Sequence, residues 1–359
     1  MTAATNKDLL VSMIQTKSNC LVEAAFECLR RRMLVSNWPD PRGPTNGVQV
    51  KWLRKRGPAR TTSIFPVKVD TGDVARMIET HEARAWTACV EAAAALVGNP
   101  FKAEVDLSGN SPLSTLAALN FGTFNRVIAF GVATPATDKD IVAVQEFFSA
   151  RSQSCFLIEV TPASRPESLA QSLIRHGLSP IAERVAKCCR NVHDLPPILP
   201  SIEVRELSSS DREGWSADNT AAWGVPAFFG AWFGATLGRE GFRHYGVFHR
   251  DLLVSTGAIY VTDDVAWSGF SATRPEHRGR GYQTATHIRR LHDAAAMGCN
   301  LVHTETAADT LAKPSPSLRN QIGVGFNRIY DKHSFAPVGN TQVVQGATNV
   351  GLIGRTPVN

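Results

Sequence analysis

Apolar and polar positions alternate in two regular ways along residues 71–200. Apolar residues at helical spacing predict three helices, over residues 74–96, 138–150 and 166–176. Continuous apolar runs predict three buried strands, over residues 125–133, 155–161 and 185–189. This succession of helices and strands indicates a compact α/β unit.

A second unit follows a proline-rich connection at residues 194–200, which we predict as the domain boundary. Its first strand is expected at residues 202–206, and helical stretches rich in aromatic residues continue to about Leu237. Three strands are then predicted, over residues 244–249, 253–262 and 265–272. The remaining pattern predicts a helix at 281–297, a strand at 301–306, a helix at 317–324 and a strand at 327–332.

The composition is that of an ordinary globular chain of 359 residues, with 43% hydrophobic and 19% charged residues. The sequence has no apolar run of about 18 residues, which a membrane-spanning helix would need, and no secretory signal pattern at its start. Seven cysteines without a CxxC pair indicate reduced thiols and a cytoplasmic protein. The adjacent Cys188 and Cys189 leave a redox-active pair open as the alternative.

All the excess positive charge lies in residues 1–70, which hold twelve basic and five acidic residues. We expect this segment to be a poorly ordered extension of the folded chain. An arm that binds nucleic acid or a membrane surface, or a transit peptide, is the alternative. The remaining chain is close to neutral, which disfavours nucleic acid and membranes as its partners.

One short motif between a predicted strand and a predicted helix indicates a phosphate site. Arg278-Gly279-Arg280-Gly281 leads directly into an amphipathic helix. Glycines allow backbone N–H groups to approach an anion, and the start of a helix adds unpaired N–H donors. Arginines can add charged hydrogen bonds to a diphosphate. A solvated basic turn is the alternative interpretation.

With these elements and motifs, residues 201–335 resemble the GCN5-related N-acetyltransferase (GNAT) superfamily. The superfamily's phosphate loop, Gln/Arg-x-x-Gly-x-Gly/Ala, is matched from Arg278 onward, except that Gln283 replaces a small residue. A second signature, a helix that starts with serine and ends in Gly-Phe, is matched by Ser317 to Gly325-Phe326. The resemblance implies a mixed, mostly antiparallel sheet flanked by helices.

Residues 71–200 resemble the same superfamily more faintly, through Arg175-His176-Gly177-Leu178, and contain no phosphate-loop motif. The whole chain is thus similar to tandem GNAT proteins, in which one domain has lost the cofactor site. The predicted domains are a basic extension at 1–70, a degenerate GNAT-like domain at 71–200 and an acetyltransferase domain at 201–359. The α/β (α+β) fold is therefore expected twice.

The resemblance implies acetyl-CoA as co-substrate and assigns residues to it. The strand end should pair with the pantetheine arm through its backbone, at Phe270, Ser271, Ala272 and Thr273. The loop and helix start should bind the diphosphate, at Arg278, Gly279, Arg280, Gly281, Tyr282, Gln283 and Thr284. Ser317 and Asn320 lie three residues apart, so both could contact pantetheine, with simple helix capping by Ser317 as the alternative.

The resemblance also suggests catalytic groups. Glu305 lies on the strand where several family members place a base, with a partly exposed structural carboxylate as the alternative. The family's usual acid, a tyrosine, is replaced here by Gln321, and Tyr330 is the substitute candidate. His303 shares a strand face with Glu305 and is interpreted as structural.

The aromatic residues between Trp215 and Phe233 fall where the family builds its acceptor pocket, although core packing accounts for most such rings. The histidines show no metal-ligand spacing, so no metal is expected. We therefore expect an N-acetyltransferase that acts on a small-molecule amine. The alternatives are a degenerate acyl-CoA-binding sensor or scaffold, and nucleic-acid binding through residues 1–70.

Overall fold

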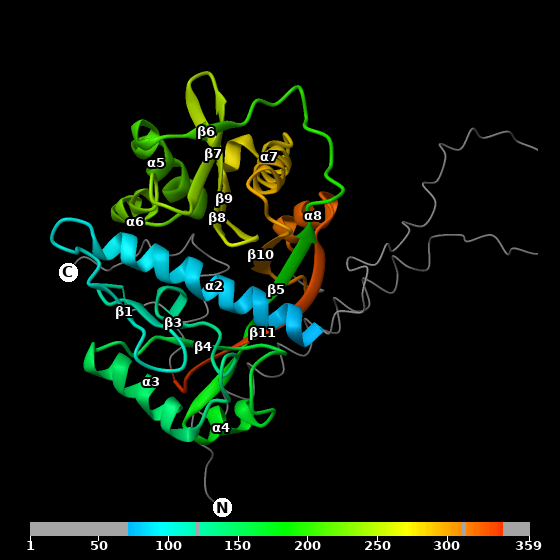
Figure 1. Ribbon diagram of the computed structural model, residues 1–359. Helices are drawn as coiled ribbons and strands as arrows, with labels where there is room; N and C mark the ends of the chain where they lie inside the picture. The colour runs from blue at the N-terminus through cyan, green and yellow to red at the C-terminus, as the bar shows by residue number, and fades with distance from the viewer. Residues whose placement is uncertain (1–70, 120–121, 311–313, 340–359) are drawn as a thin grey trace, which may run out of the picture. The chain divides into compact units, whose positions relative to one another are not determined.

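In the computed structural model, residues 71–119, 122–310 and 314–339 are described, and their strands form one mixed sheet of eleven strands (Figure 1). Eight of the strand pairs are antiparallel and two are parallel, which confirms the mostly antiparallel character. Where the sequence predicts a separate sheet in each of two domains, the described residues form a single one. The basic segment 1–70 lies outside the described residues, so its low order stays a prediction.

The first half of the chain supplies α2 (Thr71–Ala94), β1 (Ala103–Asp106), β2 (Leu113–Leu116), η1 (Gly122–Phe124), β3 (Arg126–Val127), α3 (Asp138–Ala150), β4 (Leu157–Val160), α4 (Leu169–Arg175) and β5 (Leu178–Asn191). Helix α3 has the predicted bounds. The predicted strand at 125–133 is wrong beyond Val127, because Ala129 and Gly131 adopt φ of 59° and 72° and turn the chain out of the extended conformation.

The second half supplies β6 (Arg205–Leu207), η2 (Ser209–Asp211), α5 (Arg212–Trp223), η3 (Ala227–Phe229), α6 (Gly230–Ala235), β7 (Phe242–His249), β8 (Leu252–Thr262), β9 (Val265–Thr273), η4 (Pro275–His277), α7 (Tyr282–Ala296), β10 (Leu301–Ala307), α8 (Pro316–Gly323) and β11 (Asn327–Pro337). The predicted order is confirmed throughout. Strand β11 begins at Asn327, as predicted, and continues to Pro337, because it pairs on both sides with other strands.

The two halves exchange their last strands at the centre of the sheet. The strand order is β1-β2-β3-β4-β11-β5-β10-β9-β8-β7-β6. Strand β5 of the first half therefore pairs with β10 and β11 of the second, and β11 pairs with β4 of the first. The exchange is the physical reason why the two predicted sheets are one.

The order of elements around this centre occurs twice. In the first half, β3 and β4 are parallel and α3 connects them, and α4 leads into β5. In the second half, β9 and β10 are parallel and α7 connects them, and α8 leads into β11. Helices α3 and α7 thus hold corresponding places.

Helix α2 crosses one face of the sheet, and α7 covers the opposite face (Figure 1). On the α2 side, Ile78 packs with Cys189 and Leu301. On the other side, Ile288 and Leu291 pack with the strand core. Both sheet faces are therefore buried around β5 and β10.

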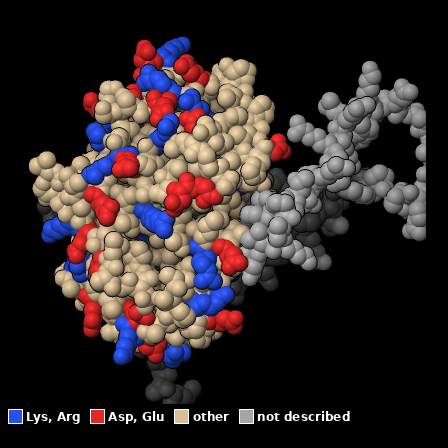
Figure 2. Space-filling view, viewed as in Figure 1, with Lys and Arg blue, Asp and Glu red and all other residues tan. Residues whose placement is uncertain are grey.

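The predicted aromatic cluster lies mainly in the core. Trp215, Phe229, Trp232 and Phe233 are buried in one cluster under α2, whereas Phe228 is 55% exposed. Core packing is thus confirmed for four of these rings. Lysines and arginines alternate with acidic residues over the face that carries α2, so this face has no large patch of one sign (Figure 2).

The described cysteines carry no sign of redox chemistry. Cys188 and Cys189 are fully buried, and burial raises the pKa of Cys188 to about 11 and that of Cys189 to about 12. A redox-active pair would need an accessible thiolate. Within the described part of the chain, no helix is both long enough and apolar enough to cross a membrane.

Candidate cofactor site and the adjoining charge network

Strands β9 and β10 begin as neighbours and then diverge. Their parallel pairing runs only from Val265 with Leu301 to Trp267 with His303. Beyond that point β9 remains paired with β8 and β10 with β5. The predicted cofactor-binding strand end, Phe270 to Thr273, therefore lies after the divergence.

A β-bulge in β9 follows the divergence. The register shifts between Thr256 and Ala258, so that two residues of β9 lie opposite Gly257. Phe270 in the bulge has φ of 50°, and its buried ring packs against Trp267 and other aromatic core residues. Such strained positions persist only where the surroundings hold them.

Arg290 of α7 holds the bulge from the opposite face. Its guanidinium donates to the carbonyls of Ala258 and Gly269, at 3.3 and 3.2 Å, and to Ser271 Oγ at 2.9 Å. The side chain is 1% exposed, and burial lowers its pKa to about 9, so it is cationic at neutral pH. A Cβ at Gly257 would lie 2.7 Å from Arg290 Cζ, so glycine leaves the space that the guanidinium occupies.

The predicted phosphate loop forms a glycine turn at the start of α7. Gly279 and Gly281 have φ of 76° and 79°, a region that favours glycine. Gly281 is the N-cap of α7 and has no side chain with which to cap it. The first N–H groups of a helix have no acceptor within the helix. The start of α7 therefore offers donors to an anion.

The two loop arginines contact the protein. Arg278 Nε donates to the carbonyl of Thr273 at 3.1 Å, and Arg280 lies 3.5 Å from the carbonyl of Glu276. These contacts brace the turn through neutral acceptors. Arg278 and Arg280 are both exposed, so their charge stays available to a diphosphate.

Helix α8 borders the same site. Asn320 Nδ2 donates to Gln283 Oε1 at 2.6 Å, so the structure brings these two predicted residues together. Ser315, not Ser317, caps α8, because Ser315 Oγ accepts from the N–H of Leu318 at 3.2 Å. The capping alternative for Ser317 is therefore wrong, and Ser317 lies half-buried in the first turn.

Unpaired polar atoms remain where β9 and β10 diverge. Thr304 Oγ1 donates to the carbonyl of Ser268 at 2.8 Å, and Gln321 Nε2 lies 3.5 Å from Thr304 Oγ1. Within the described residues, Ser268 Oγ and Gln321 Oε1 are buried without a hydrogen-bond partner. Buried polar groups usually have partners, and the amides of the expected pantetheine arm would supply them if the arm lies where β9 and β10 diverge.

Glu305 lies next to this site, at the edge of a buried group of charges. Its Oε2 is 2.6 Å from Lys332 Nζ and 3.5 Å from Lys187 Nζ, and its Oε1 is 3.2 Å from Arg126 Nη2. Burial raises the pKa of Glu305, but the three cations together lower it further, to well below its usual range. A carboxylate held this way is a weak base.

We name the group around Glu305 the seam network. Its members come from six elements and comprise Glu79, Glu82, Arg126, Glu159, Lys187, Glu305, Tyr330 and Lys332. Sequence reasoning found only Glu305 and Tyr330. Glu159 and Lys187 were detectable in principle, because each is a charge within an apolar run and must find a partner. Lys332 was not, since Asp331 and His333 flank it in a polar segment.

Tyr330 is held by the same network. Its hydroxyl donates to Glu79 Oε1 at 2.7 Å. Burial and the neighbouring carboxylates raise the pKa of Tyr330 well above its usual range. The phenolic proton is therefore held tightly, which weakens Tyr330 as a proton donor to a leaving group.

His303 and His81 form a buried pair, with His81 Nδ1 at 2.9 Å from His303 Nε2. Burial lowers the pKa of His81 to about 4 and that of His303 well below its usual range. Both rings are therefore neutral at physiological pH, which agrees with a structural role for His303. The described residues contain no cluster of three metal-ligating side chains.

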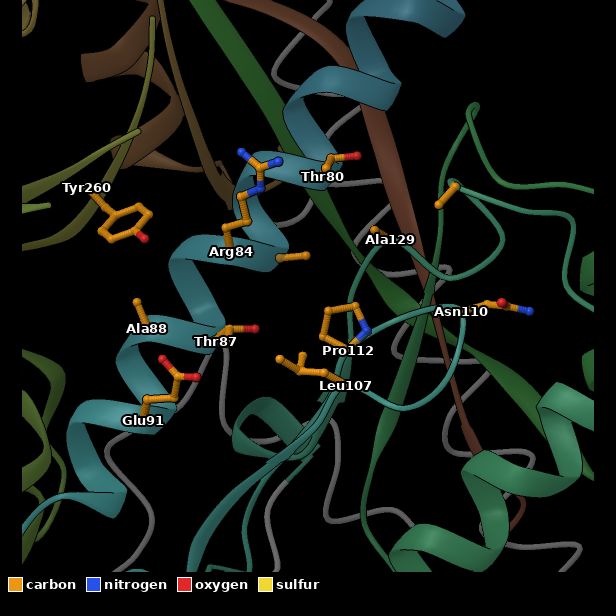
Figure 3. Close-up of a pocket in the computed structure, with 12 residues that line it drawn as sticks. Thr80, Arg84, Thr87, Ala88, Glu91, Leu107, Asn110, Pro112, Ala129 and Tyr260 are labelled. Carbon is orange, nitrogen blue, oxygen red and sulfur yellow. The ribbon is translucent and has the colours of Figure 1, made fainter. Parts of the chain in front are cut away.

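A cavity of about 400 Å³ lies along α2, and no residue of the phosphate loop lines it (Figure 3). Thr80, Arg84 and Glu91 of α2 line it, with Tyr260 on one side of the helix and Leu107 on the other. The aromatic residues from Trp215 to Phe233 do not line this cavity, so it does not test the expected acceptor pocket. The candidate cofactor site is therefore located by the divergence of β9 and β10 and by the glycine turn before α7, and not by this cavity.

Comparisons with known proteins bear on the fold. No family model and no curated protein matches the sequence. A GCN5-related N-acetyltransferase from Kribbella flavida aligns at 16% identity and a TM-score of 0.50, over 70% of this chain and 96% of that chain. One from Sphaerobacter thermophilus aligns at 17% identity and a TM-score of 0.47, over 75% and 92%. The first likeness establishes the GNAT fold and confirms that expectation.

Proposed function

We propose that this protein transfers an acetyl group from acetyl-CoA to the amine of a small molecule. The observation that carries the proposal is the route from the divergence of β9 and β10 to the glycine turn at the start of α7. It combines a stretch of β9 that no longer pairs with β10 and an open helix start, which suits a pantetheine arm that ends in a diphosphate.

In this proposal the chain's own groups bind the co-substrate in two places. Main-chain amides from Gly279 to Thr284 bind the diphosphate, with Arg278 and Arg280 adding charge. The backbone of Phe270 to Thr273 binds the pantetheine arm. Acetyl-CoA supplies the reactive thioester, and the bulge braced by Arg290 fixes where that thioester lies.

Glu305 is the proposed acceptor of the amine proton, since it reaches the end of β10 beyond the divergence. Its side chain is 21% exposed, the most accessible carboxylate of the seam network. The thiolate of coenzyme A leaves readily, and alignment of amine and thioester supplies much of the rate. A dedicated acid is therefore not required.

We also propose that residues 71–200 and 201–359 are two GNAT halves in tandem. The repeated order of elements around β3–β4 and β9–β10 supports this. In this proposal the first half has lost its cofactor site and the second keeps it, and each completes the other's sheet.

A second candidate is an acyl-CoA-binding sensor without turnover. Gln321 occupies the position of the family's tyrosine and is buried against Thr304. Glu305 is held by three cations, and the Tyr330 hydroxyl is bound to Glu79. These contacts favour binding without chemistry.

The proposal is tested by calorimetric titration of acetyl-CoA into wild type and Gly281→Glu. The variant places a negative side chain at the diphosphate, so affinity should fall by at least about 100-fold, or roughly 3 kcal/mol. An unchanged affinity contradicts the loop assignment. Release of coenzyme A across a panel of small amines then separates the enzyme from the sensor, which binds acetyl-CoA without turnover.

A further inference from the structure

The seam network contains more acid than base. Its carboxyl groups are Glu79, Glu82, Glu159 and Glu305, and its cations are Arg126, Lys187 and Lys332. All these side chains are at most 8% exposed except Glu305. If every group were ionised, the network would hold one net negative charge away from water, which is costly.

The contacts show where that excess is concentrated. Lys332 Nζ lies 3.3 Å from Glu82 Oε2 and 2.6 Å from Glu305 Oε2. Lys187 Nζ contacts the same two oxygen atoms, with 3.5 Å to that of Glu305. Two lysines thus bridge one pair of carboxyl groups, of which Glu82 is buried and Glu305 is partly exposed.

We propose that Glu82 and Glu305 share one proton and act together as the base of the acetyl transfer. Glu305 meets the substrate, and Glu82, from α2 of the first half, is a positioning residue that acts through it. The inference rests on the proposed function and deepens it. It makes the first half part of the reaction centre rather than a support alone.

The proton balance of this step is closed. An amine that enters as ammonium gives one proton to the carboxylate pair, which breaks an N–H bond and frees the lone pair. The nitrogen then forms the C–N bond as the C–S bond of the thioester breaks. The second nitrogen-bound proton neutralises the thiolate, and the pair returns its proton to water.

The surroundings of Glu82 support a shared proton. Burial and Glu305 raise the pKa of Glu82 to about 7, against the effect of Lys187 and Lys332. The other charged or titratable groups that face the pair are Glu79 and His81 of α2, Arg126 of β3, Glu159 of β4, His303 of β10 and Tyr330 of β11. A coupled pair near neutrality is a better base at physiological pH than an isolated, salt-bridged Glu305.

The test begins without substrate, by hydrogen-ion titration of the folded proteins between about pH 5 and about pH 9. Wild type should bind about one proton more than Glu82→Gln near neutrality, because the variant network is already neutral. Glu146→Gln, which removes an exposed glutamate of α3, is the matched control for the loss of one carboxyl group. Superimposable curves for wild type and Glu82→Gln near neutrality would overturn the proposal.

A variant that fails to fold does not end the test. Infrared spectra of wild type should show absorption of protonated carboxyl groups at about pH 6 that disappears by about pH 8.5, with contributions from the carboxyl pair and from Asp218. Glu305→Gln should remove the contribution of the pair and leave that of Asp218, whereas Asp218→Asn should leave that of the pair. Identical spectra of folded wild type and Glu305→Gln contradict a shared proton.

Kinetics test the catalytic part. Glu82→Gln should lower kcat about tenfold or more at neutral pH and shift the acidic limb of the kcat profile downward, with KM for acetyl-CoA unchanged. Glu82→Asp should return the acidic limb of the kcat profile toward its wild-type position. An unshifted profile refutes the positioning role, whereas absence of turnover in wild type refutes the proposed function and leaves the titration to decide the shared proton.

Discussion

Helices α3 and α7 hold corresponding places in the two halves, but their first turns are opposite in character. At α3, Thr137 Oγ1 accepts from the N–H of Asp140 at 3.3 Å, and Asp140 accepts from the N–H of Thr137 at 2.7 Å. At α7, the N-cap is Gly281, in the left-handed region. The start of α3 satisfies its own N–H donors and carries acidic side chains. The start of α7 leaves its N–H donors open and has arginines beside it.

The preceding loops differ in the same sense. In the first half, the carbonyl of Gly131 accepts from the N–H of Arg165 at 2.8 Å, and a Cβ at Gly131 would lie 2.4 Å from the Arg165 carbonyl oxygen. In the second half, nothing lies within 4 Å of a Cβ built at Gly279. The loop that precedes the helix is therefore filled by the protein's own backbone before α3 and kept open before α7. Very few residues make this difference.

The largest expected effect comes from giving α7 the cap of α3. The double variant Gly281→Thr/Thr284→Asp introduces a capping box at the same helix positions as Thr137 and Asp140. Acetyl-CoA affinity, measured by calorimetry, should fall at least about 100-fold, because the capping box satisfies the donors and the new carboxylate adds a negative charge. The turn also changes, since a β-branched residue at position 281 disfavours the φ of 79° that its glycine adopts. Retained affinity would show that the helix start does not bind the diphosphate.

The next largest effect is expected at low pH, which should destabilise the second half more than the first. Burial lowers the pKa of His81 to about 4 and that of His244 to about 3, and lowers the pKa of His287 and His303 well below the usual range. Their stabilising contribution is present above about pH 6.5 and is lost as the pH falls, roughly 3 kcal/mol for His81 alone. The raised pKa of Asp218, about 6, opposes this effect.

Three of these four histidines lie in the second half, where His287 belongs to α7 itself. Hydrogen exchange at about pH 4.5 should therefore lose protection in β7 and α7 before α3. Loss of protection in α3 before β7 and α7 would contradict the role given to the buried histidines. The difference in protection between the two halves should vanish at about pH 7.5.

A smaller effect is expected at the bulge in β9, which the buried Arg290 braces. Gly257→Ala should lower the free energy of unfolding by about 1–3 kcal/mol, because its Cβ would displace the Arg290 guanidinium. Denaturant titration measures this. Gly214→Ala, in α5 with only ordinary contacts, is the control and should stabilise slightly. Equal stability of the two variants would count against the bracing role.

The smallest effect is expected at the closed helix start. Thr137→Ala removes one cap of α3 and should cost about 1 kcal/mol of stability. Acetyl-CoA affinity should stay at the wild-type value. A change in affinity would mean that the first half also contacts the co-substrate.

Local signals explain what the sequence predicted well. The bounds of α3 were predictable because Thr137 and Asp140 form a local capping box. The glycine turn before α7 was predictable because its φ values require glycine at Gly279 and Gly281. Such features depend on residues within a few positions of one another.

Features that depend on distant residues were not predictable in this way. Glu82 and Lys332 meet across 250 positions, so no window of sequence contains their contact. Strand β5 was predicted over five residues although it runs over 14, because two neighbours from the second half stabilise its polar part. Core packing of most aromatic residues between Trp215 and Phe233 was predictable because large rings are usually buried, whereas the place of an acceptor pocket stays a prediction.

The place of β11 between β4 and β5 has a consequence for synthesis of the chain. The first half leaves the ribosome without the strand that completes it, since that strand is among the last described residues to be made. Until then, the open edges of β4 and β5 are exposed to pairing with other nascent chains. Release of β11 from the exit tunnel, rather than completion of either half, is therefore the event that should commit this protein to its native state.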